Sequence, residues 1–93
     1  MSAERKVERD FTVNAELGLH ARPAGRFAQQ AARYSSEISV GRGDEWVDAR
    51  SVLSLLSLAA GPGVRLRLRA AGGDAEEAVE ALGRLLEEPG EGG

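Results

Sequence analysis

The sequence predicts an α+β open-faced sandwich, in which a four-stranded antiparallel sheet carries three helices on one face. Four short segments have the apolar pattern of strands, and three repeat apolar residues at helical spacing. They follow the order strand, helix, strand, strand, helix, strand, helix (βαββαβα). Because one strand alternates apolar residues with arginines, we expect one sheet face to be buried and the other to face solvent.

The first half of the chain supplies a strand, a helix and a hairpin. We expect a strand over 6–13, a loop over 14–19, a helix over 21–33, and strands over 37–40 and 45–49 joined by a turn over 41–44. Gly18 is the expected hinge of the loop. Apolar residues that repeat along one helical face indicate the helix.

The second half supplies the remaining helices and the clearest strand. We expect a helix over 51–59, a strand over 64–70 and a last helix that begins after Asp74. Helical spacing places four apolar residues of the first of these helices toward the core: Val52, Leu55, Leu56 and Ala59. Asp74 is expected to cap the last helix, with Glu77 in the capping-box position.

Length and composition indicate a small globular protein. The 93 residues suffice for a single domain, which we expect to be ordered over about 5–88 with a flexible tail over 89–93. No apolar run approaches the ~20 residues of a membrane span, and the charged N-terminus does not resemble a secretion signal. The absence of cysteine fits a reducing compartment, so we expect a cytoplasmic protein without membrane insertion.

The chain's one histidine, His20, lies where the glycine-hinged loop meets the first helix. A helix start has unpaired backbone N–H groups that stabilise an anion. An imidazole nitrogen can take a phosphoryl group there and release it again, because it is both a nucleophile and a good leaving group. Arg22 would supply positive charge for the phosphoryl oxygens, and Pro23 would stiffen the first turn. The alternative is that His20 is only a polar capping residue.

Other ligand classes are not favoured. A metal site needs several ligands, and the chain has no second histidine and no cysteine, so no metal or cofactor is expected. The net charge of −3 argues against nucleic acid, and the arginines at 65, 67 and 69 are explained by a solvent-exposed sheet face.

The string Gly18-Leu19-His20-Ala21-Arg22-Pro23-Ala24 resembles the active-site signature of HPr, the histidine phosphocarrier family of the bacterial sugar phosphotransferase system. The resemblance extends over about 7–87, so residues 1–93 are expected to form one HPr-like domain. It implies that His20 takes a phosphoryl group on Nδ1 from phosphorylated enzyme I and passes it to IIA domains of sugar permeases. The protein would then be a monomeric phosphoryl carrier rather than an enzyme.

Residues 48–58 resemble a second region of the same family. In many Gram-positive HPr proteins a serine kinase phosphorylates the position matching Ser51. The alternative is that Ser51 only caps the second helix. The resemblance also implies partner docking on the first and second helices, where we assign four residues: Arg26, Val52, Leu53 and Leu56. Leu53 is expected to be partly exposed, since a short helix cannot bury all its aliphatic side chains, but an ordinary surface leucine explains it equally well.

Two departures and three alternatives accompany this interpretation. Leu17 stands where many HPr proteins have a small polar residue, and Gly25 inside a helix costs up to ~1 kcal/mol relative to alanine. Gly25 would allow close packing near the site. The alternatives are a nitrogen-system paralogue, a purely regulatory paralogue, and a small-molecule-binding regulatory domain of similar layout.

Overall fold

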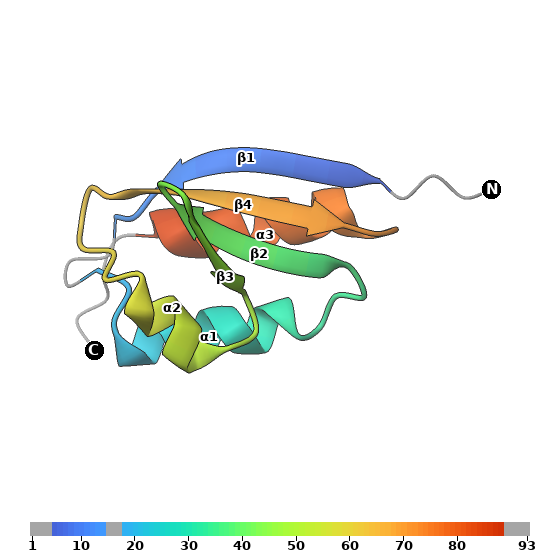
Figure 1. The fold of residues 1–93 in the computed structure, drawn as a ribbon. Helices are drawn as coiled ribbons and strands as arrows, with labels where there is room; N and C mark the ends of the chain where they lie inside the picture. Colours follow the sequence, from blue (N-terminus) through green and yellow to red (C-terminus); the bar gives the residue numbers. More distant parts are fainter. Residues whose placement is uncertain (1–4, 15–17, 89–93) are drawn as a thin grey trace.

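The computed structural model describes residues 5–14 and 18–88, which form one sheet with three helices on one face (Figure 1). The elements are β1 (Lys6–Thr12), α1 (Ala21–Ala31), β2 (Glu37–Arg42), β3 (Glu45–Asp48), α2 (Val52–Ser57), β4 (Arg65–Ala71) and α3 (Ala75–Glu87). The expected α+β fold and its element order are confirmed. The tail expected over 89–93 lies outside the described residues.

The sheet has the strand order β1-β4-β2-β3, and every neighbouring pair is antiparallel. β4 therefore lies between β1 and β2, which explains its strict alternation. Its apolar residues are fully buried beneath the helices: Leu66, Leu68 and Ala70. Its arginines are exposed on the open face, as expected.

Two of these arginines, Arg67 and Arg69, contact side chains on other strands of the open face. Arg67 Nε donates to Asp10 Oδ1 at 3.0 Å and lies 3.5 Å from a Glu8 oxygen. The Arg69 guanidinium lies 3.8 Å from the centre of the Trp46 ring. Gly41 makes room for that ring, since a Cβ on Gly41 would lie 2.8 Å from the indole. The charges of Arg67 and Arg69 are thus engaged within the sheet itself.

The core lies between the sheet and the helices and is mainly aliphatic. α1 contributes Phe27, which is only 1% exposed, and α3 contributes fully buried Val79 and Leu82. Gly83 allows α3 to approach β1 closely, because a Cβ there would overlap the ring of Phe11. A glycine inside α3 therefore serves packing rather than flexibility.

The expected inward orientation of Ala59 is wrong. α2 ends at Ser57, and Ala59 is exposed with a φ of 52°, in the left-handed region. Once the chain leaves helical geometry, the helical spacing no longer predicts which side chain faces the core. Leu58, at the C-cap, is buried instead.

The expected capping box at Asp74 is also wrong. Asp74 is the N-cap residue of α3, but its carboxylate makes no capping hydrogen bond. It accepts hydrogen bonds from the backbone N–H groups of Ser35 and Ser36, both at 2.9 Å, and from their two hydroxyls. Asp74 thus joins the start of α3 to the segment before β2. The hydroxyl of Ser36, followed by the amide of Ser35, lowers the pKa of Asp74 to about 2.

The low pKa of Asp74 predicts a contribution to stability that depends on pH. Because the folded-state pKa lies below the ordinary value of 3.8, the contribution is present above pH 3.8 and is lost as the pH falls through about 2. The urea midpoint of Asp74→Asn should lie below that of the wild type at neutral pH, and the gap should narrow across this window. Asp44→Asn, in the exposed turn of the hairpin, is the control. A gap that stays constant down to about pH 2 would contradict the assignment.

Candidate functional site

His20 occupies the N-cap position of α1, with an extended backbone (φ −97°, ψ −168°). Its carbonyl accepts the first hydrogen bond of the helix, from the Ala24 amide at 2.8 Å. Its side chain is exposed and makes no capping hydrogen bond, so the alternative that the ring caps the helix is wrong. Within the described part of the chain, neither imidazole nitrogen has a hydrogen-bond partner. The ring is therefore accessible to an incoming group.

The first turn of α1 has free hydrogen-bond donors beside His20. The amides of Ala21 and Arg22 donate to no acceptor among the described residues, and Pro23 has no amide hydrogen. Such donors, together with the positive end of the helix dipole, stabilise an anion. The Arg22 side chain is exposed on the same turn. The site thus combines a nucleophilic nitrogen with groups that bind negative charge.

The end of α2 supports the loop that leads to His20. The Leu19 amide donates to the Ala60 carbonyl at 2.8 Å. Gly18 has a φ of 78°, and a Cβ on it would lie 2.7 Å from both the Ala60 oxygen and the Gly61 Cα. Only glycine fits this contact without displacing backbone atoms.

Gly18→Ala is expected to destabilise the protein by about 1–3 kcal/mol, because it adds both backbone strain and overlap with backbone atoms. Urea unfolding measures this loss. Gly43→Ala is an informative control: Gly43 also has a positive φ, of 61°, but a Cβ there meets no atom of the described chain within 4 Å. Equal losses in the two variants would show that strain alone matters and that the contact with residues 60–61 does not.

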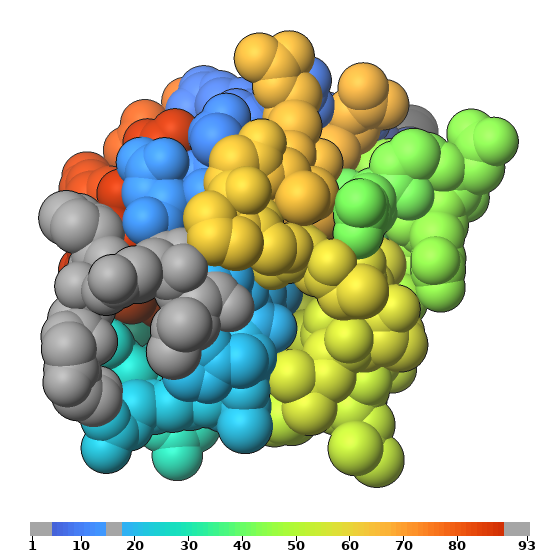
Figure 2. All heavy atoms as spheres, turned by 90° about the vertical axis from the view of Figure 1, so that its left-hand side faces the viewer, coloured from blue at the N-terminus to red at the C-terminus, as the bar shows by residue number. Residues whose placement is uncertain are grey.

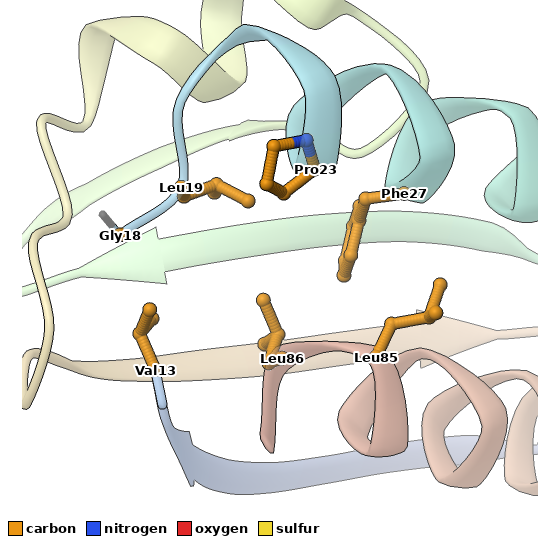
Figure 3. Close-up of a pocket in the computed structure, with 7 residues that line it drawn as sticks. All are labelled: Val13, Gly18, Leu19, Pro23, Phe27, Leu85 and Leu86. Atoms are coloured by element: carbon orange, nitrogen blue, oxygen red, sulfur yellow. The ribbon is translucent and has the colours of Figure 1, made fainter. Parts of the chain in front are cut away.

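An apolar cavity lies beneath the start of α1 (Figure 3). Pro23 and Phe27 of α1 face Leu85 and Leu86 of α3 across it. The remaining lining residues are Val13, Gly18 and Leu19. None of the described residues that line this space is charged, so we assign it to anchoring the first turn of α1 to α3 rather than to binding a charged ligand. The ring of Pro23 therefore contributes to positioning His20 through packing.

Ser51 is the N-cap residue of α2, as expected, and its Oγ accepts a hydrogen bond from the Ser54 amide at 3.2 Å. Leu53, two residues further on, is 80% exposed, which confirms the expected exposure of its side chain. Val52 and Leu56 are half-buried. These residues lie on a helix that packs beside α1 (Figure 1).

Arg26 is exposed on α1, and its guanidinium lies 3.8 Å from a Glu88 oxygen. Gly25 does not serve close packing as expected, because a Cβ there would meet no atom of the described residues within 4 Å. Leu17, the other departure, lies outside the described residues.

Over the described ranges, no group of three acidic, cysteine or histidine side chains is placed to bind a metal ion. None of the helices described is both long and apolar enough to span a membrane.

Arg42 is a further residue of this region, and its contacts were not predicted from the sequence. Its Nη1 donates to the carbonyls of Leu58 and Ala59, at 2.8 and 2.9 Å. No local pattern around the hairpin turn indicates this role, because the acceptors are 16 and 17 residues away. The exposed end of β2 is thus tied to the end of α2.

The chain is similar to several known proteins over most of its length. The family model of the PTS HPr component phosphorylation site matches residues 7–88. The phosphocarrier protein HPr of Haloferax volcanii is 42% identical over 85 residues, which span 89% of this chain and 96% of that protein. The HPr-like protein Crh of Halalkalibacterium halodurans is 42% identical over 81 residues, 87% of this chain and 96% of the relative. The crystal structure of HPr from Bacillus anthracis superposes with a TM-score of 0.84 at 37% identity, covering 87% and 96% of the two chains.

Proposed function

We propose a phosphoryl-carrier function from one premise: the chain belongs to the HPr family. His20 accepts a phosphoryl group from phosphorylated enzyme I and donates it to the IIA domains of sugar permeases. The observation that carries the proposal is the exposed imidazole of His20, which has no hydrogen bond within the described chain. It lies beside the amides of Ala21 and Arg22, which donate to no described acceptor. The protein acts as a carrier that partner enzymes load and unload.

The transfer exchanges one P–N bond for another. The lone pair of one His20 ring nitrogen, Nδ1 by the family resemblance, attacks phosphorus in line with the leaving nitrogen of the donor's phosphohistidine. The bond to the donor breaks as the bond to His20 forms. The donor imidazole leaves as a neutral ring, and the second nitrogen of His20 keeps its proton. In delivery to a IIA domain, the phosphorylated His20 is the donor, and a nucleophilic nitrogen of the IIA domain attacks the phosphorus.

The first turn of α1 stabilises the transferred charge. The amides of Ala21 and Arg22 can donate to phosphoryl oxygens, and the Arg22 guanidinium adds a mobile positive charge. Pro23 faces Leu85 and Leu86 across the apolar cavity and so fixes the first turn of α1. The donor groups of that turn therefore do not have to become ordered during transfer. Storage and release both follow from modest stabilisation of a weak P–N bond.

Partners dock on the surface formed by α1 and α2. Its apolar part is Leu53, 80% exposed, flanked by half-buried Val52 and Leu56. Arg26 adds charge on the neighbouring helix. An exposed aliphatic side chain beside cationic groups fits a partner with an apolar and acidic surface.

The direct test is phosphorylation of the purified chain by enzyme I and phosphoenolpyruvate, followed by intact mass spectrometry. We expect one phosphoryl group per chain, which acid removes and an added IIA domain accepts. An established HPr in the same reaction confirms that the enzyme I is competent. If that protein is loaded and this chain is not, the carrier function is wrong.

Ser51 is the candidate for regulation. A phosphate on its hydroxyl would place about −1.5 to −2 charges at the N-terminus of α2, next to the docking surface, and would repel an acidic partner. Because Ser51 is the N-cap residue of α2, the phosphate would lie beside the first amides of that helix. An HPr serine kinase with ATP should give an acid-stable phosphate that Ser51→Ala loses and Ser57→Ala retains. Phosphate retained in Ser51→Ala would contradict it.

The family also contains relatives with other names, such as the HPr-like protein Crh. A nitrogen-system or purely regulatory paralogue therefore stays an alternative. A comparison of the loading rates with enzyme I of the sugar system and with its nitrogen-system counterpart distinguishes a nitrogen-system paralogue from the proposed sugar carrier. Efficient loading without delivery to any IIA domain would favour a regulatory protein. The relatives described above give no support to a small-molecule-binding domain.

A further inference from the structure

The support of the His20 loop depends on the turn that follows α2. Ala60 supplies the carbonyl that accepts the Leu19 amide at 2.8 Å, one residue before His20. Residue 18 contacts the same turn through the Ala60 oxygen. On one face of the molecule, the yellow segment at the end of α2 lies between the start of α1 (cyan) and the green hairpin segment (Figure 2). A shift of the turn would therefore move the backbone that presents His20.

This turn has an unfavourable backbone conformation. Ala59, immediately before Ala60, is the one described residue other than glycine with a positive φ. An L-residue keeps such a conformation only when surrounding contacts enforce it. The carbonyls of Leu58 and Ala59, at the end of α2, also need donors from outside the helix.

Arg42 provides that contact. Its Nη1 donates to both carbonyls, at 2.8 and 2.9 Å, from the last residue of β2. A guanidinium at a helix C-terminus also meets the negative end of the helix dipole. The hairpin thus fixes the turn on which the loop before His20 rests.

We infer that Arg42 is a positioning residue for phosphoryl transfer, because it fixes the turn whose Ala60 carbonyl holds Leu19 and so sets the position of His20. The inference rests on the proposed carrier function. Arg42 does not touch the phosphoryl group in this scheme. It acts through the two hydrogen bonds that it donates to the turn and through the one that the Leu19 amide of the loop donates to the same turn.

The test compares Arg42→Met with Arg65→Met. Arg65 is a matched control, since it is also exposed and has no hydrogen bond or ion pair among the described residues. Both variants lose the same charge, but only Arg42→Met loses the contact with α2. Arg42→Lys keeps the charge and one donor group, and it serves if Arg42→Met folds poorly.

The first readout is hydrogen exchange of the Leu19 amide in the unphosphorylated protein. We expect exchange to become about tenfold faster in Arg42→Met, with an intermediate increase in Arg42→Lys and no change in Arg65→Met. The Leu82 amide in the core of α3 reports global unfolding and corrects for lost stability. Unchanged Leu19 exchange in Arg42→Met would overturn the inference, whether or not the chain accepts phosphate.

The second readout is the rate of loading by enzyme I, with this chain as the varied substrate. Arg42→Met should lower kcat about tenfold while KM changes less than twofold, because positioning acts on the transfer step. If Arg42 merely attracted the partner, its replacement by methionine would raise KM and leave kcat unchanged. A raised KM with unchanged kcat, or an equal loss of kcat in Arg65→Met, would overturn the inference. If the wild type accepts no phosphoryl group at all, the proposed function fails, and the exchange experiment still tests the contact.

Discussion

His20→Ala is expected to abolish the acid-labile phosphate completely while leaving the fold intact. The substitution removes the nitrogen that accepts the phosphoryl group. The sequence contains no second histidine that could replace it. The ring is exposed and makes no hydrogen bond in the described chain, so the free energy of unfolding should change by no more than about 0.5 kcal/mol. Intact mass after loading by enzyme I and urea unfolding measure the two effects separately.

The matched control is Gln29→Ala, an exposed polar truncation on the same helix. It should load like the wild type. Acid-labile phosphate that persists in His20→Ala would place the acceptor elsewhere and contradict the proposed chemistry. A large loss of stability in His20→Ala would show instead that the ring has a structural role that the geometry does not indicate.

Phe27→Ala is expected to destabilise the protein by about 3–5 kcal/mol. Phe27 is 1% exposed, and it lies among the largest fully buried side chains of the described core. It packs one turn beyond Pro23, between α1 and α3, so its removal opens the existing cavity into a larger one (Figure 3). In a domain of this size such a loss is a large part of the total stability. Urea unfolding followed by circular dichroism measures it.

Leu53→Ala is the corresponding apolar truncation on the surface. At 80% exposure, Leu53 buries little area, so its loss should change the free energy of unfolding by less than about 0.5 kcal/mol. A similar loss in both variants would mean that Leu53 is buried in solution. A small loss in Phe27→Ala would mean that the surrounding side chains collapse into the vacated space.

The element order was predictable because each element has a strong local pattern. The alternation of residues 64–70 identified β4, and the glycine hinge followed by Pro23 located the start of α1. His20 at a helix N-terminus was a consequence of the same local signals. The close packing at Gly83 was also predictable, since a glycine inside an apolar helical stretch indicates close packing. The partner, Phe11, could not be read from the sequence alone.

The errors arose where distant segments determine the geometry. Asp74 has a good local capping sequence, but Ser35 and Ser36 offer its carboxylate four donors from across the fold. Ala59 leaves the helix early because the end of α2 turns sharply and receives the Arg42 side chain. These partners lie more than ten residues away in the sequence, so the helical periodicity of a short segment cannot reveal them. Tertiary contacts therefore override the local preference at both places.

Trp46, the chain's one tryptophan, stacks on Arg69, an exposed residue of β4. Its indole emission consequently reports on the integrity of the sheet, because the stack joins β3 to β4. A fluorescence titration with a labelled partner can thus record binding in one channel and unfolding in another. The molecule carries an internal spectroscopic reference that needs no added probe.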